Sequence, residues 1–162
     1  MKTASLRNKA IVVSLMLAMG SAVPSLAADA HSHDGASSQA LKLNAGKKWA
    51  TDAPLRKGTT EIRNAIAKDT AAIHAGKLSD AGFNDLAARI DTQVAYIVTN
   101  CKLPPEADAQ LHLVLADIMQ GSSAMKGKES GMTRQAGAEE IVVALDAYGR
   151  HFEHPGWKGL AH

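Results

Sequence analysis

The sequence predicts an all-α protein, an antiparallel up-down-up-down four-helix bundle that follows a disordered N-terminal arm. Apolar residues recur every three or four positions in four separate stretches, which is the spacing of one face of an α-helix. Short connections that contain Pro or Gly separate these stretches, and connections so short make consecutive helices antiparallel neighbours. No segment of any length alternates apolar and polar residues as a strand does.

Residues 1–28 have the three-part build of a secretory signal peptide. Lys2, Arg7 and Lys9 precede an apolar run over 10–18, and small residues follow to the end of the segment. The apolar run is shorter than the roughly 20 residues that a membrane-spanning helix needs. We therefore expect cleavage of this segment, a periplasmic mature protein, and no membrane association after cleavage.

Cleavage would change the charge balance of the chain. It removes three of the 18 basic residues and none of the 16 acidic ones, which leaves 15 basic and 16 acidic residues. This balance excludes the strongly basic surface of proteins that bind nucleic acid or anionic membranes. The single cysteine cannot form an internal disulfide, so one hydrophobic core must hold about 130 mature residues together, in a monomer or a homodimer.

The bundle is expected to span residues 51–154. Its first helix begins at Thr51 or Asp52, because both side chains can cap a helix N-terminus. It ends at Gly76, because glycine adopts the left-handed conformation of a C-terminal cap at little cost. Four residues form the apolar stripe of this helix: Leu55, Ile62, Ile66 and Ile73.

The second and third helices meet at a proline break. The second begins at Ser79 or Asp80 and ends near residues 100–102, because Pro104 and Pro105 each disfavour the α conformation in the preceding residue. Pro105 can then occupy the first turn of the third helix, where its missing N–H costs nothing. The stripes of the two helices are Phe83, Leu86, Ile90, Val94, Ile97, Val98 and Cys101, and Leu111, Val114, Leu115, Ile118 and Met119.

The third helix is expected to end near Met125, before a loop over 127–131 that is rich in Gly, Lys and Ser. The fourth helix then covers about 132–152. Its apolar residues are spaced by three and four positions: Ala138, Ile141, Leu145, Tyr148 and Phe152.

Two further segments flank the bundle. Residues 29–50 are expected to form a flexible arm, because their first part consists mainly of Ala, Ser, His, Asp and Gly without apolar periodicity. Trp49, near the end of this arm, is expected to tuck against the bundle end. In the C-terminal tail over 155–162, Pro155 cannot continue a helix, so we expect Trp157 to fold back over the bundle end.

This layout resembles the exported cytochrome b562-like and cytochrome c′-like bundles over about residues 53–152. The 55–66 segment is similar to the first helix of the b562 family, and Ala147-Tyr148 with the His/aromatic ending after it is similar to the last helix. The Pro-Pro-Glu turn at 104–106 is also similar to that of uncharacterised small periplasmic proteins of Gram-negative bacteria. The resemblance implies an exported four-helix fold.

The haem ligands of the b562 family do not carry over. The position of the methionine ligand falls near Thr59 and that of the histidine ligand near Gly149. His151 lies two residues further on, which turns its side chain about 200° around the helix. The C-x-x-C-H sequence of c-type proteins is absent, because Cys101 is the only cysteine. Haem would therefore need unusual ligation.

The expected topology gathers Cys101, Asp108, His112, His151 and His154 at one pole of the bundle. Thiolate and imidazole are ligands that suit copper and zinc. We therefore predict a metal site that uses Cys101, His112, His151 and His154. In the alternative interpretation Cys101 is an ordinary buried residue, His112 is hydrogen-bonded to Asp108, and the other two histidines are solvated at the helix end.

The arm offers an accessory metal site at His31 and His33. Cleavage after Ala28 or Ala30 places a histidine third in the mature chain. The terminal amine, two backbone amides and the imidazole could then form a square-planar site for Cu(II) or Ni(II). Cleavage after Ala27 places His31 fourth and removes that geometry, and the alternative to any site here is a solvated linker.

The sequence favours a protein without enzymatic activity. It contains no nucleophile elbow, phosphate loop or H-E-x-x-H sequence, and the adjacent Glu139 and Glu140 diverge on a helix. We predict a periplasmic protein that binds or buffers a transition metal, copper before nickel or zinc. The alternative from another class is a cofactor-free interaction or stress-response module with a protein partner, which an exposed apolar patch around Trp49 and Trp157 would favour. A b-type haem protein is a further alternative.

Overall fold

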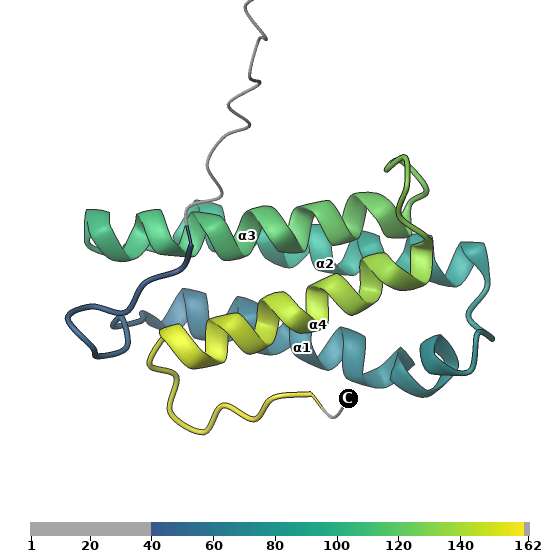
Figure 1. Ribbon diagram of the computed structural model, residues 1–162. Coiled ribbons are helices and arrows are strands. Elements are labelled where there is room, and N and C mark those ends of the chain that lie inside the picture. The colour runs from purple at the N-terminus through teal and green to yellow at the C-terminus, as the bar shows by residue number, and fades with distance from the viewer. Residues whose placement is uncertain (1–39, 161–162) are drawn as a thin grey trace, which may run out of the picture. The chain divides into compact units, whose positions relative to one another are not determined.

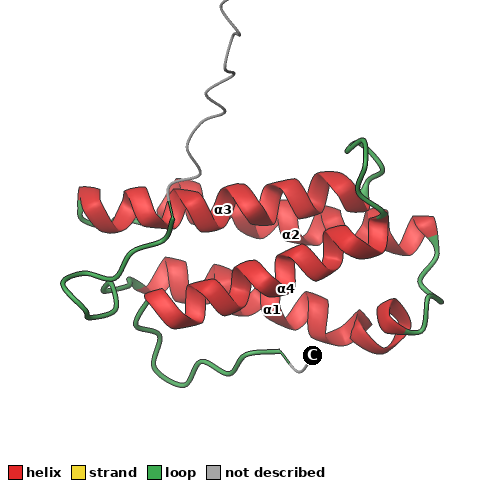
Figure 2. Ribbon diagram, in the orientation of Figure 1, coloured by secondary structure: helices red, strands yellow, loops and turns green. Residues whose placement is uncertain are grey.

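The computed structural model describes residues 40–160, and the predicted signal peptide, His31 and His33 lie outside this range. The described part is all-α, as predicted, and it contains four helices and no strand (Figures 1 and 2). None of these helices is both long and apolar enough to cross a membrane. The helices are α1 (Ala53–His74), α2 (Asp80–Asn100), α3 (Pro105–Met125) and α4 (Arg134–His151).

Three of the four helices begin with a side-chain cap. Asp52 accepts a hydrogen bond from the backbone N–H of Leu55, with N to O 2.8 Å apart, and Ser79 caps α2 in the same way. Thr133 caps α4, so this helix begins two residues later than the sequence predicted. The third helix begins at Pro105 without a side-chain cap, since Pro104 precedes it.

Each helix packs against the next along the chain, and α4 also contacts α1 (Figure 1). Charged pairs tie neighbouring helices together at the surface. Arg89 of α2 lies 2.6 Å from the carboxylate of Asp69 in α1. Asp91 of α2 accepts hydrogen bonds from Ser122 of α3 and from Lys126, the residue that follows α3, at 2.5 and 2.6 Å.

The four helices do not pack equally, because small residues bring α3 and α4 together. A Cβ built on Gly137 would lie 2.6 Å from the carbonyl oxygen of Gly121 and 2.7 Å from the Cβ of Ala124. Only glycine permits two helix backbones to approach this closely. The α3–α4 pair is consequently the most closely packed, and α1 and α4 pack less closely than the helix pairs that follow one another along the chain. The fourth helix runs obliquely from α1 at its C-terminal end towards α3 at its N-terminal end (Figure 1).

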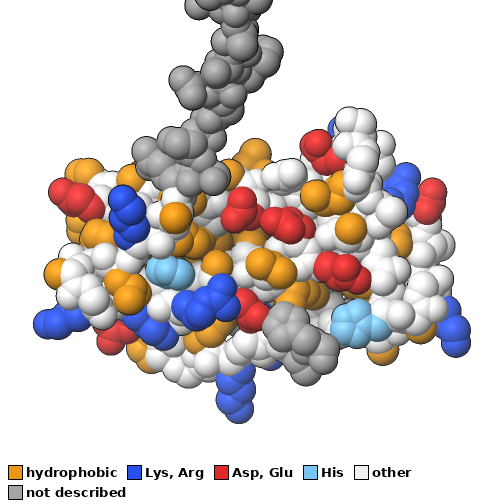
Figure 3. Space-filling model, in the orientation of Figure 1, with side chains coloured by type: hydrophobic (Ala, Val, Ile, Leu, Met, Phe, Trp, Pro, Cys, Tyr) orange, Lys and Arg blue, Asp and Glu red, His pale blue; other side chains and the backbone are white. Residues whose placement is uncertain are grey.

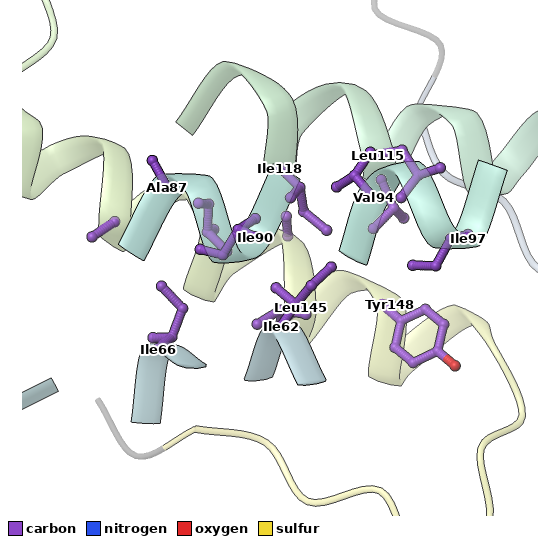
Figure 4. Packing of buried hydrophobic residues seen from close by; sticks show 14 of the residues in the cluster. Ile62, Ile66, Ala87, Ile90, Val94, Ile97, Leu115, Ile118, Leu145 and Tyr148 are labelled. Atoms are coloured by element: carbon purple, nitrogen blue, oxygen red, sulfur yellow. The ribbon is translucent and has the colours of Figure 1, made fainter. Parts of the chain in front are cut away.

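The core lies between all four helices and consists mainly of branched aliphatic side chains. Figure 4 shows Ile62 of α1, Ile90 of α2, Ile118 of α3 and Leu145 of α4 pointing towards one another, and each is fully or almost fully buried. Tyr148 lies at one end of this cluster.

The prediction was wrong for two stripe residues. Val98 and Met119 are 63% and 55% exposed. Each follows a buried residue at the preceding position of the same helix, so it lies on the flank of the apolar stripe, beyond the width that the neighbouring helices cover.

Both flanking segments contact the bundle. As expected, Trp49 packs against the bundle end. Its backbone N–H donates to the carbonyl of His151, and its backbone carbonyl accepts from the N–H of Glu153, both at 2.8 Å. Further back in the predicted arm, the N–H of Lys42 donates to the side chain of Gln110 in α3, at 2.7 Å. Part of the segment predicted as an arm therefore belongs to the packed structure.

Trp157 folds back over the bundle end, which confirms the prediction for the C-terminal tail. Its indole lies edge-on to the Tyr148 ring, with centroids 5.0 Å apart, and packs beside the His154 ring at the same distance. A Cβ on Gly149 would meet the indole at 2.7 Å, so the absence of a side chain there makes room for the tail.

Candidate functional site

The structure brings part of the predicted metal-binding set together. Cys101, Asp108 and His112 line one small cavity of about 50 Å³ between α2 and α3, with apolar residues between them. Nδ1 of His112 lies 2.9 Å from the carbonyl oxygen of Asp108 and 3.3 Å from its carboxylate. His112 is therefore paired with Asp108, as the alternative interpretation of the sequence expected, and its side chain is largely exposed.

The other two predicted histidines do not line this cavity. Nδ1 of His151 lies 2.8 Å from the carbonyl oxygen of Ala147, one turn back in α4. Nδ1 of His154 lies 3.0 Å from the hydroxyl of Tyr148. Among residues 40–160, no three His, Cys, Asp or Glu side chains gather in an arrangement that could hold a metal ion.

The electrostatic surroundings of Cys101 favour the protonated thiol. Burial raises the pKa of Cys101 to about 12, and the negative charges of Asp52 and Asp108 act in the same direction. Because the thiolate is the nucleophile and the metal ligand, either role requires loss of a firmly held proton.

Asp52 does more than cap α1. Its second carboxylate oxygen accepts a hydrogen bond from the N–H of Lys102 at 2.6 Å, so it joins the start of α1 to the connection between α2 and α3. Burial alone would raise the pKa of Asp52, but the N–H groups of Lys102 and Leu55 stabilise the carboxylate and lower the pKa overall. The sequence indicated the cap but not this second bond.

Tyr148, His154 and Trp157 form a connected group at the same end of the bundle. Burial raises the pKa of the fully buried Tyr148 to about 12, so its hydroxyl remains protonated at neutral pH. Burial and the positive charge of Arg56 lower the pKa of His154, which favours the neutral imidazole. Sequence reasoning placed Tyr148 in the core stripe and missed its hydrogen bond.

Thr59 and Gly149, near which the predicted resemblance to the b562 family would place the haem ligands, are both occupied by contacts within the protein. Thr59 is fully buried, and its hydroxyl donates to the carbonyl of Leu55 at 2.9 Å. Gly149 is covered by the indole of Trp157.

A groove that sequence reasoning missed lies between the C-terminal half of α1 and the N-terminal half of α4. It has a volume of about 280 Å³ and is partly open to solvent. Its lining is mainly apolar and includes three polar side chains: Ile66, Thr70, Ile73, His74, Ala138, Glu139, Val142 and Val143. The groove follows from the oblique path of α4, which the contact between Gly121 and Gly137 holds close to α3.

Apolar side chains also reach the surface elsewhere. Figure 3 shows them in orange between acidic and basic side chains on the face in view. Val143 is 54% exposed at the groove, whereas Val98 and Met119 are exposed on α2 and α3. The groove differs from these places because several apolar side chains converge there around a much larger hollow, about 280 Å³ against about 50 Å³ for the cavity that Val98 helps to line.

Comparison of the chain with protein-family models, with curated proteins and with solved structures finds no match. The resemblance to cytochrome b562-like bundles therefore stays a prediction, and the function has to be inferred from the geometry described above.

Proposed function

We propose that the protein is an exported, periplasmic binding module without catalytic activity or cofactor, and that its four helices follow one another up and down. In this proposal the groove between α1 and α4 receives an apolar group of a partner protein or a small apolar ligand. The observation that carries the proposal is the partly open apolar hollow of about 280 Å³. Concave, mainly apolar sites with a few polar groups are the usual form of ligand pockets.

The composition of the groove indicates how such a group would be held. Ile66, Ile73 and Ala138 are almost fully buried and form its floor, while Val143 leaves more than half of its surface in water. Covering that surface would contribute about 25 cal/mol for each Å² of apolar area removed from water. Thr70, together with His74 and Glu139 at the rim, would orient a polar end of the ligand.

Val143→Asp tests this proposal, with a neutral, environment-sensitive naphthylamine dye as the probe. We expect the wild-type protein to bind the dye with an increase in emission, and the variant to bind it at least about tenfold more weakly, because a carboxylate cannot enter an apolar contact without losing its hydration. Fluorescence titration measures the change.

Val98→Asp is the matched control for this experiment. It places the same charge at a valine of similar exposure on α2, 63% for Val98 against 54% for Val143, away from the groove. The proposal fails if the dye does not bind the wild-type protein, or if both variants weaken its binding equally.

Transition-metal binding is the second candidate function. The observation in its favour is that Cys101, Asp108 and His112 line one cavity. In this proposal the three side chains move together when the ion binds, because no three such groups of residues 40–160 already lie in an arrangement that could hold it. They then provide sulfur, oxygen and nitrogen ligands, with His31 and His33 as an accessory site, and copper is preferred to nickel or zinc. Binding would have to displace the proton from Cys101.

His112→Ala tests the metal proposal. A ligand that binds only the native state stabilises it by mass action, so saturating Cu(II) or Zn(II) should raise the thermal midpoint of the wild-type protein. We expect the variant to lose most of that increase in a differential scanning experiment. His74→Ala, which removes an exposed histidine at the end of α1, should keep it. A wild-type midpoint that no metal changes would argue against this function.

A further inference from the structure

A second pocket, distinct from the groove, lies between α1 and the C-terminal tail. Its volume is about 150 Å³. No Asp or Glu is among its lining residues, nearly all of which carry hydrogen-bond donors or positive charge. They are Thr60, Arg63, Asn64, His154, Gly156, Trp157 and Lys158.

The guanidinium of Arg63 is fixed in position by the tail. Its Nε donates to the carbonyl of Lys158 at 2.5 Å, and one terminal nitrogen donates to the carbonyl of Gly159 at 3.4 Å. The other terminal nitrogen donates to the side-chain oxygen of Asn64 at 3.2 Å. These bonds use three of the five N–H donors of a guanidinium, which leaves one N–H on each terminal nitrogen. Such a pair is the fork that binds two oxygens of one oxyanion.

The Tyr148 hydroxyl sets the donor properties of His154. Its oxygen lies 3.0 Å from Nδ1 of the imidazole. When this hydroxyl donates to Nδ1 of the neutral ring, the ring proton lies on Nε2, which then is a donor for another group. Trp157 and Lys158 also line the pocket.

We propose that this pocket binds a small oxyanion, a carboxylate or phosphate group, through the Arg63 fork and the Lys158 ammonium. Asn64 and His154 supply further donors around it, whereas the Thr60 hydroxyl already donates to the carbonyl of Arg56. Because the tail already holds the guanidinium in place, little side-chain freedom is lost on binding. The site is independent of the groove, since the two share no lining residue.

The test is titration of the full mature chain with inorganic phosphate and, separately, with acetate, at constant ionic strength. Chemical shifts of the Trp157 indole N–H measure binding. Arg63→Gln and Lys158→Gln should each weaken binding about tenfold or more, because each removes a charge-assisted hydrogen bond. Lys158→Gln leaves the hydrogen bond that holds Arg63 in place, since this bond uses the backbone carbonyl of residue 158 and not its side chain. Weaker anion binding by this variant would therefore not result from a displaced Arg63.

Lys68→Gln is the control, because it removes an equal charge from an exposed position of α1 outside the pocket. Binding of both anions, with loss in the two pocket variants alone, supports a general oxyanion site; binding of one anion alone supports the site and assigns its chemistry. The proposal is overturned if neither anion shifts the indole resonance, or if Lys68→Gln weakens binding as much as Lys158→Gln, which would indicate general charge attraction.

Discussion

Gly137→Ala is expected to destabilise the fold by about 2 kcal/mol, although alanine favours a helix over glycine by about 1 kcal/mol. The new Cβ would lie 2.6 Å from the carbonyl oxygen of Gly121, 2.7 Å from the Cβ of Ala124 and 3.0 Å from the backbone nitrogen of Met125. None of these atoms is the end of a flexible side chain, so α3 and α4 would have to separate. Urea unfolding at equilibrium measures the loss.

Gly82→Ala is the matched control for this prediction. It makes the same change within a helix, but its Cβ would meet chiefly the side chain of Leu78, which can move. We expect this variant to be as stable as the wild-type protein or more so. Equal stability of Gly137→Ala and Gly82→Ala would show that the close contact of α3 and α4 does not limit the fold. Because separation from α3 would push α4 towards α1, Gly137→Ala should also weaken dye binding in the groove.

Tyr148→Ala is expected to have the largest effect, a loss of about 3–5 kcal/mol in the free energy of unfolding. The ring is fully buried and stacks on Phe152, with centroids 5.3 Å apart, and it also contacts Trp157 and His154. Its removal would leave a cavity where the end of α4, the tail and the core meet. Chemical denaturation followed by circular dichroism gives the difference.

Tyr148→Phe separates the packing of the ring from the role of its hydroxyl. We expect a loss of only about 1 kcal/mol, the usual value for one neutral hydrogen bond. If the phenylalanine variant were as unstable as the alanine variant, the stacking of the ring would not be the main contribution.

Tyr148→Phe also tests how the stability of the protein depends on pH in alkaline solution. The pKa of Tyr148 is raised to about 12 in the folded protein, against about 10 in an unfolded chain. The protonated phenol therefore contributes stability that is fully present below about pH 10 and is lost as the pH rises to about 12. Tyr148→Phe should lack this part of the alkaline loss. The Cys101 thiol gives a loss of the same sign in both proteins, so it cancels in the comparison.

Local signals in the sequence were sufficient to predict the helices. The bounds of α3 follow from residues at its own ends: Pro104 and Pro105 at the start, and Gly127, with a φ of 70°, beyond the end. The start of α4 was missed by two residues, because Met132 extends the apolar spacing whereas the hydroxyl of Thr133 supplies the cap.

The relative placement of the helices could not be predicted in the same way. The groove depends on the contact between Gly121 and Gly137, which belong to different helices, and neither glycine reveals the other in the sequence. For the predicted metal set, topology correctly placed Cys101 and His112 beside one cavity. It could not show the direction of the His151 ring, because a local contact of Nδ1 with the carbonyl oxygen of Ala147 in the same helix determines that direction.

The backbone pairing around Trp49 also bears on how the chain is made. The hydroxyl of Thr51 donates to the carbonyl of Glu153, 102 residues later, and the N–H of Glu153 donates to the carbonyl of Trp49. A chain that leaves the ribosome N-terminus first cannot form these bonds until Glu153 has emerged. Contacts of such long range also slow the folding of small domains. Trp49 and Thr51 therefore lack these partners until Glu153 has been made, and this end of the bundle closes late.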